Sequence, residues 1–267
     1  MNKLFLAVLA SLVSLGLFAQ DSTNVSQKQN RKNQKRERIN NLMRMEEEGD
    51  LIFNKHSIFG IRLATDGYGI SWEKGKYKTP YRTLLYAFEL NEKHDPKEHK
   101  VSASTDLFNY STLVPYKLNN LYELRASIGE ERLIGGKGNK NGVAVTFLYT
   151  GGLSLALIKP YFLDMQKPSG ATYRTTWDRY LQDTATNDVP TGASGFTVGW
   201  DDLSIKPGVN AKTAMRFDYG RLNQTITAIE VGLTGEFFTG KIPLVYKVPA
   251  KQFFFNAYVS ILFGSRK

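Results

Sequence analysis

The stretch QFFFNAYVSILF, Gln252–Phe263, decides the fold class of this 267-residue chain. Every second residue in it is apolar: Phe253, Phe255, Ala257, Val259, Ile261 and Phe263. The residues between them are mostly polar or amphipathic. Because successive side chains of a β-strand point to opposite faces, the stretch predicts a strand that lies between an apolar phase and a wetter one.

Seven further stretches after Asp50 show the same alternation. They lie within residues 58–65, 68–73, 83–90, 122–129, 143–157, 209–219 and 228–237. In the longest of them the alternation passes through Gly151 and Gly152 without a change of phase. We therefore expect one long, kinked strand there rather than a hairpin, and eight strands in all.

The expected connections between these strands alternate in length. On the side of the two termini they fall at residues 75–80, 135–141 and 221–224, and all are short. On the other side they fall at residues 66–67, 93–119, 164–206 and 239–251, and three of these four are long. An even strand number with this asymmetry predicts an all-β fold, an eight-stranded antiparallel transmembrane β-barrel, preceded by a partly helical N-terminal segment.

Charged residues of both signs fall on the strand face opposite the apolar one. They are Arg62, Glu73, Glu89, Glu123, Arg125, Lys212, Arg216, Asp218, Glu230 and Glu236. Burying an unpaired charge is costly, and the interior of an eight-stranded barrel is just wide enough for side chains to fill. We therefore expect a lumen filled by a network of paired charges, without the wide channel of a porin.

Periodicity does not say which strand face is inside. The alternative is a soluble lipocalin-like binding barrel, whose apolar side chains surround a ligand. Aromatic residues near the expected strand ends favour the membrane barrel, because aromatic girdles lie at membrane interfaces. These residues are Tyr68, Trp72, Tyr81, Tyr122, Tyr149, Tyr161, Tyr219 and Phe253.

The N-terminus divides into two parts ahead of the predicted barrel at residues 51–267. Residues 1–19 have a short basic start and an apolar run, which predicts a secretory signal peptide with cleavage after Ala19. Residues 20–50 are polar and basic, and Ile39, Leu42 and Met43 have the spacing of a narrow apolar helix edge. This segment is either a solvated linker or a helix that docks on a partner or on acidic head groups.

Five residues are candidate partner contacts. Arg36, Arg38 and Leu42 lie in the basic segment, and Trp177 and Trp200 lie in the longest connection. Large aromatic side chains and arginines carry much of the binding energy at protein interfaces. The alternative for the two tryptophans is packing within their own loop.

The sequence contains little that indicates catalysis or metal binding. The absence of cysteine excludes disulfides and thiolate chemistry. His94 and His99 are separated by Pro96, which breaks any helix that would present them together, so we expect a solvated charged loop and no metal. A lipid-modifying enzyme that uses these histidines with Ser102, Ser104 or Asp106 is the alternative, but no nucleophile motif accompanies them. We expect no enzyme and no cofactor.

Three stretches of the chain resemble eight-stranded outer-membrane barrel proteins of Bacteroidota. They are FAQ at residues 18–20, GGLSLALIKPY at residues 151–161 and YVSILFG at residues 258–264. A terminal aromatic strand such as the last of these is the signal read by the barrel-insertion machinery. The resemblance implies an outer-membrane location with both termini in the periplasm, contact with lipids and lipopolysaccharide, and no nucleic-acid partner. It also implies a scaffold or accessory subunit of a larger outer-membrane machine for secretion or assembly.

Overall fold

The computed structural model describes residues 29–34, 36–37, 40, 53–106, 109–137, 142–182, 187–220 and 224–267. The chain from Phe53 to Lys267 forms one compact unit, separate from the segment that precedes it. In that preceding segment, the described residues 29–34, 36–37 and 40 are helical and exposed. The predicted signal peptide, and Arg38 and Leu42 of the basic segment, lie outside the described residues.

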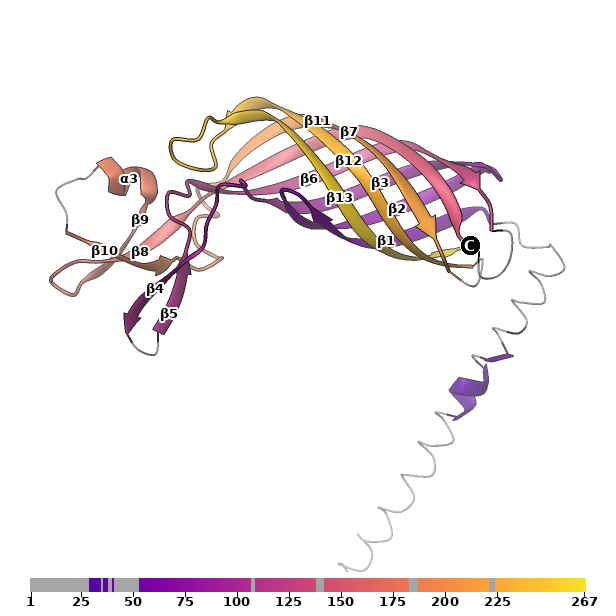
Figure 1. The fold of residues 1–267 in the computed structure, drawn as a ribbon, viewed down its shortest axis with the longest axis horizontal. Helices are drawn as coiled ribbons and strands as arrows, with labels where there is room; N and C mark the ends of the chain where they lie inside the picture. The colour runs from indigo at the N-terminus through magenta and orange to yellow at the C-terminus, as the bar shows by residue number, and fades with distance from the viewer. Residues whose placement is uncertain are drawn as a thin grey trace, which may run out of the picture. The chain divides into compact units, whose positions relative to one another are not determined.

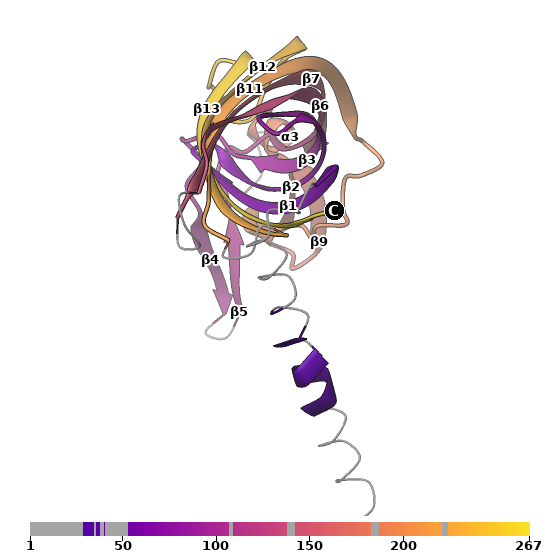
Figure 2. The same ribbon diagram turned by 90° about the vertical axis from the view of Figure 1, so that its right-hand side faces the viewer.

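Eight strands close into an antiparallel barrel, which confirms the predicted fold class (Figures 1 and 2). Around the ring the order is β1-β13-β12-β11-β7-β6-β3-β2, so the first and last strands pair and close it. The strands are β1 (Lys55–Ala64), β2 (Gly67–Thr79), β3 (Arg82–Lys93), β6 (Asn119–Gly135), β7 (Ala144–Pro160), β11 (Ser204–Asp218), β12 (Thr225–Ile242) and β13 (Lys251–Arg266).

The outward face of the barrel is largely apolar, and the charged residues of the predicted network point inward. On the closing strand β13, Phe255 and Val259 are exposed, whereas Tyr258 and Ser260 are buried. The same phase holds on the other strands, whose burial patterns alternate residue by residue. A soluble barrel would place its apolar face inside, so this distribution excludes the lipocalin-like alternative.

The barrel strands extend further toward the termini than predicted. Residues 75–78 were expected in a turn, but they belong to β2, which runs to Thr79. Gly75 faces inward, and a Cβ atom there would lie 2.2 Å from Cε1 of the His56 ring. The glycine therefore makes room for a buried imidazole within a strand, and the chain turns at Pro80 and Tyr81 instead.

The long strand through Gly151 and Gly152 is continuous, as predicted. Both residues lie within β7 and pair with β6 and β11. A Cβ atom on Gly152 would lie 2.1 Å from the carbonyl oxygen of Ala126 on β6. Glycine at this position permits a close approach of two backbones, which explains why the strand carries it without turning.

The two longest connections at the far end of the barrel are folded, which the sequence did not predict. They contain β4 (Val101–Asp106) paired with β5 (Asn109–Leu113), and a sheet of β8 (Phe162–Gln166), β9 (Thr172–Thr176) and β10 (Val189–Ala193) with helix α3 (Trp177–Gln182) (Figure 1). We call residues 94–118 and 161–203 the cap. Its core consists of Leu113, Val114, Tyr161, Leu163, Met165 and Trp177. Tyr161 thus belongs to the cap core and not to an aromatic girdle. In the described part of the chain, no helix is long and apolar enough to cross a membrane.

Candidate functional site in the barrel lumen

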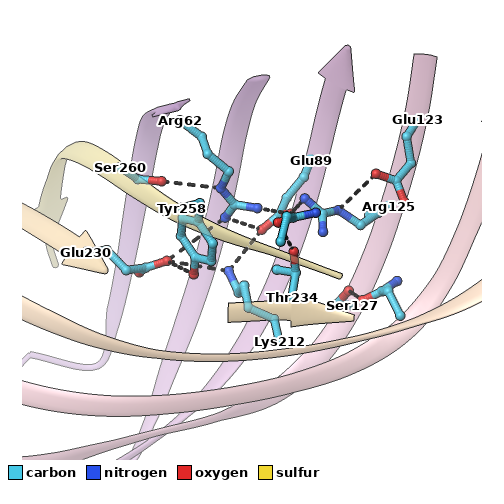
Figure 3. A network of polar contacts seen from close by, with 12 residues as sticks. Arg62, Glu89, Glu123, Arg125, Ser127, Lys212, Glu230, Thr234, Tyr258 and Ser260 are labelled. Atoms are coloured by element: carbon cyan, nitrogen blue, oxygen red, sulfur yellow. Dashed lines mark hydrogen bonds and ion pairs between the residues drawn. The ribbon is translucent and has the colours of Figure 1, made fainter. Parts of the chain in front are cut away.

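The predicted lumen charges all lie inside the barrel and are buried. They are Arg62, Glu73, Glu89, Glu123, Arg125, Lys212, Arg216, Asp218, Glu230 and Glu236. Inward positions on the barrel strands bring nine of them, together with Lys93, into contacts across the lumen, several of which Figure 3 shows. We call this set, without Asp218, the lumen network. Asp218 lies apart from it and pairs with Arg266, 2.6 Å away.

One half of the lumen network centres on Lys212 and Arg216 of β11. The ammonium of Lys212 lies 3.1 Å from Glu73 and 2.9 Å from Glu89. The guanidinium of Arg216 donates to Glu73 at 2.5 Å and to Glu230 at 2.6 Å. Each cation therefore bridges carboxylates from two strands, so that no charge in this half depends on a single partner.

Arg62 connects the network to the closing strand (Figure 3). Its guanidinium donates two parallel hydrogen bonds to Glu89, at 2.6 and 2.8 Å, and stacks 3.9 Å above the ring of Tyr258. The hydroxyl of Tyr258 donates to Glu230 at 2.7 Å. The two-pronged pairing and the stacking both use the planar guanidinium, which a lysine lacks.

The other half of the network lies toward the cap. Lys93 bonds to Glu236, and Arg125 donates to Glu236 at 2.8 Å. Glu123 lies 3.6 Å from Lys93 and 3.7 Å from Arg125, and neither of its oxygens accepts a hydrogen bond. Glu123 is therefore held by ion pairing alone.

Several of these contacts join opposite walls of the barrel. In the ring order, β11 and β2 are four strands apart in either direction, as are β3 and β12. Lys212 and Glu73 bridge the first pair of strands, and Lys93 and Glu236 bridge the second. Because side chains meet across the full width of the barrel, the lumen at these levels is filled by protein.

The ten charges of the lumen network are divided equally between the two signs, and at its edges Asp66 lies 3.2 Å from Lys93 and Glu131 lies 3.3 Å from Arg216. The network contains five cations, Arg62, Lys93, Arg125, Lys212 and Arg216, and five carboxylates, Glu73, Glu89, Glu123, Glu230 and Glu236. Taking charges out of water is expensive unless each is paired and hydrogen-bonded. Apolar clusters lie on either side along the barrel, with Leu121, Phe238 and Ile242 toward the cap and Ile58, Ile226 and Leu262 toward the termini.

Two buried residues of the lumen, Lys93 and His56, were not predicted to lie there. Lys93 was assigned to a loop, although it continues the inward phase of Glu89 and Asn91, and that phase is the signal that would have placed it. His56 lies inside β1, with Nδ1 3.4 Å from the Tyr77 hydroxyl. Its Nε2 lies 3.8 Å from Glu131, which also pairs with Arg216. No local pattern in the sequence indicates that β1 and β6 approach each other here.

The residues predicted to contact a partner differ in their exposure to solvent. Trp177 is buried in the cap core, and its indole N–H donates to the carbonyl of Val114 at 3.0 Å. It offers no surface to a partner, so the alternative of packing within the loop describes it. Trp200 is 37% exposed and stacks on Tyr122 at 5.6 Å between ring centroids. Arg36 is exposed on the N-terminal helical segment.

The histidine loop next to the barrel rim is tied into ion pairs. Nδ1 of His94 lies 3.5 Å from Glu98, and Lys117 donates to the same carboxylate at 2.6 Å. Burial raises the pKa of Glu98, but hydrogen bonds from His94, Lys117 and the backbone of Asp95 outweigh it, so the pKa lies below the usual value. Within the described residues, no cluster of three or more His, Cys, Asp or Glu side chains is arranged to hold a metal ion.

The fold and the lumen define the class: this is an eight-stranded transmembrane β-barrel of the outer-membrane type, apolar outside and filled with paired charges. No family model and no curated protein matches the chain.

Solved structures similar to it include Neisserial surface protein A, at 7% identity and a TM-score of 0.38, covering 80% of this chain and 96% of that one. The attachment invasion locus protein Ail of Yersinia pestis has 7% identity and a TM-score of 0.34, with coverages of 80% and 99%. The N-terminal β-barrel domain of Pseudomonas aeruginosa OprF has 14% identity and a TM-score of 0.33, with coverages of 79% and 98%. At these scores the similarities decide neither fold nor function, and both rest on the geometry of the chain itself.

Proposed function

We propose that this protein is an integral outer-membrane scaffold, a non-enzymatic accessory subunit of a secretion or assembly complex. In this proposal both termini lie in the periplasm and the cap lies outside the cell. The observation that carries it is the filled lumen, in which Lys212 and Glu73 meet from opposite walls. A barrel closed in this way is suited to holding surfaces in place and not to conducting solutes.

An aromatic patch where the barrel rim meets the cap supports a role in protein contacts. We call Tyr122, Phe196 and Trp200 the rim patch. Phe196 is 66% exposed, and its carbonyl accepts a hydrogen bond from the Trp200 indole at 2.9 Å. The ammonium of Lys159 lies 4.8 Å above the Phe196 ring. Rigid, pre-stacked aromatic side chains lose little conformational entropy on binding, which favours them as partner contacts.

The histidine loop gives no support to the enzyme alternative. Glu98 forms an ion pair with Lys117 and contacts the ring of His94, an arrangement that stabilises the loop. In the contacts of the described side chains, neither group bonds to a serine hydroxyl, and the side chains of Ser104 and Asp106 lie outside those that the structure describes.

The test is purification of the full-length protein from outer membranes in mild detergent. We expect it to co-purify with other outer-membrane or periplasmic proteins in fixed ratio. A photo-crosslinker at Phe196 should give an adduct with one of those proteins, whereas a crosslinker at Val189, which is equally exposed on β10, should not. A lone monomer without adducts from either position would contradict the proposal.

A further inference from the structure

An apolar hollow lies on the outer surface of the barrel. It has a volume of about 500 Å³, within the range of about 300–1,000 Å³ usual for ligand sites. Five outward residues follow one another in register around the barrel wall. They are Phe59, Trp72, Phe88, Ala126 and Leu153, on β1, β2, β3, β6 and β7. Ala126 is the small member of this row, so the wall is recessed between Phe88 and Leu153.

The same strands become strongly basic just below the hollow, toward the termini. Six exposed cations occupy the outward positions of β1, β2, β3 and β6 there: Lys55, Lys74, Lys76, Lys78, Arg82 and Arg132. Among the described residues at these positions Glu130 is the one carboxylate, and it pairs with both Arg82 and Arg132. We call these six cations the basic patch. With Glu130 shared by the two arginines, the net charge of this surface is positive and resides mainly on the four lysines.

Trp72 joins the hollow to the basic patch. Its ring lines the hollow and lies 4.8 Å from the ammonium of Lys74. Its indole N–H donates to Ser57 at 3.2 Å, on the polar side of the row. An indole with one apolar edge and one hydrogen-bonded edge is typical of the boundary between acyl chains and head groups. The hollow therefore lies at acyl-chain depth and the basic patch at head-group depth.

We propose that this surface binds an anionic glycerophospholipid of the periplasmic leaflet, with its phosphate on Lys74 and Lys76 and one acyl chain in the hollow. The proposal rests on the proposed membrane location. Basic side chains at a membrane surface attract anionic head groups, and an acyl chain fills an apolar recess that the surrounding side chains leave open. The two requirements are met together only by a molecule that carries an anionic head and a hydrocarbon chain.

Fluorescence of Trp72 provides the test, because bromine atoms on lipid acyl chains quench tryptophan on contact. The protein has three tryptophans, so W177F/W200F leaves Trp72 as the sole reporter. It is reconstituted in vesicles that mix phosphatidylcholine with brominated phosphatidylglycerol, or phosphatidylglycerol with brominated phosphatidylcholine. We expect the anionic lipid to bind at Trp72 about 25-fold more tightly than the zwitterionic one, since each of the two lysines contributes roughly fivefold.

Two substitutions and a matched control sharpen the result. K74Q/K76Q should abolish the preference for phosphatidylglycerol, and A126F should lower quenching by filling the recess. K206Q/K241Q removes two lysines at the other end of the barrel and should leave the preference intact. Equal quenching by both lipids in the inserted protein would overturn the lipid site. Quenching by neither lipid in a protein that is heat-modifiable on gels would overturn it as well.

Failure of the proposed location has a different signature. A protein that neither inserts nor becomes heat-modifiable would overturn the membrane proposal, and the lipid site with it. If W177F/W200F does not fold, native mass spectrometry of the unsubstituted protein gives the same decision. If the unsubstituted protein retains more phosphatidylglycerol than phosphatidylcholine and K74Q/K76Q does not, the result supports the site. If the unsubstituted protein retains both lipids equally, the result overturns it.

Discussion

Lys212 and Glu73 face each other across the full width of the barrel, with 3.1 Å between the ammonium nitrogen and a carboxylate oxygen. Their strands, β11 and β2, are as far apart in the ring as two strands can be. The residues are 139 positions apart in sequence. This pair therefore forms only when the barrel has closed, and it connects stability to the filling of the lumen.

Removing the Lys212 charge should strongly destabilise the barrel. Lys212→Met leaves Glu73 and Glu89 short of a buried cation, and breaking a buried ion pair on one side costs about 3–5 kcal/mol. Urea unfolding in lipid vesicles measures the loss. Lys206→Met, on the same strand but at its outer end, is the control and should change stability little. Similar stabilities for both variants would show that the network adds nothing.

Opening the lumen should require the removal of equal numbers of cations and carboxylates from the lumen network. The unsubstituted protein should give no steady porin-like conductance in planar bilayers, because bridging side chains fill its width. The quadruple substitution E73A/K212A/R216A/E230A removes two cations and two carboxylates, so it empties space without leaving net charge. We expect measurable conductance from it. A steady large conductance in the unsubstituted protein would contradict the filled lumen.

The two adjacent glycines of β7 should respond differently to the same change. Gly152→Ala places a Cβ atom 2.1 Å from the Ala126 carbonyl oxygen, so the β6–β7 pairing must shift. We expect a loss of about 1–3 kcal/mol, as for overpacked interiors. At Gly151 the nearest atom to an added Cβ is 3.7 Å away, so Gly151→Ala should be tolerated. Refolding yield, measured as heat-modifiability on gels, compares the two variants directly.

The cap should unfold without the barrel when its core is truncated. Trp177→Ala removes a buried indole that packs against Tyr116 and Tyr180, and losses for such changes are about 3–5 kcal/mol. Limited proteolysis should then cut within residues 161–203 while heat-modifiability persists. Trp200→Ala, which removes an exposed ring, should leave the cap resistant. Loss of heat-modifiability in Trp177→Ala would mean that cap and barrel fold as one unit.

The first segment of the cap, residues 94–118, should loosen in acid. The pKa of Glu98 lies below its usual value of 4.5. Its contribution to stability is therefore complete above the unfolded pKa and is lost as the pH falls through the lower folded value. Protease susceptibility of residues 94–118 should rise below about pH 4. In Glu98→Gln the protease susceptibility of this segment should already be raised at neutral pH and should change less as the pH falls. If the variant shows the same rise in acid as the unsubstituted protein, the effect belongs to another group.

Local pattern was sufficient for the barrel strands but not for the cap. A strand that separates two phases repeats every two residues, and eight such stretches could be read in the sequence and were found in the ring. The five-residue strands β8, β9 and β10 are too short to display that period above the background of a polar loop. They are stabilised instead by packing of Trp177 and Tyr161 against Leu113 and Val114, which come from the other segment of the cap.

Gly75 and Lys93 show why the strand ends were misplaced. A glycine flanked by lysines looks like a turn, but Gly75 is required by the imidazole of His56, which reaches it from the neighbouring strand. Lys93 looks like the start of a polar loop, but it is a buried partner of Glu236 from the opposite wall. Both residues are explained by contacts with distant parts of the chain, which a local pattern does not contain.

The sequence by itself determined the number of membrane strands, their phase and the placement of the charges on one common face. Alternation is a property of neighbouring residues, so these features need no tertiary information. Only the tertiary structure decided that the charged face is the inside, and which cation meets which carboxylate. Ring closure determines both, because it brings β1 beside β13 and β2 opposite β11, and strand periodicity is the same whichever face ends inside.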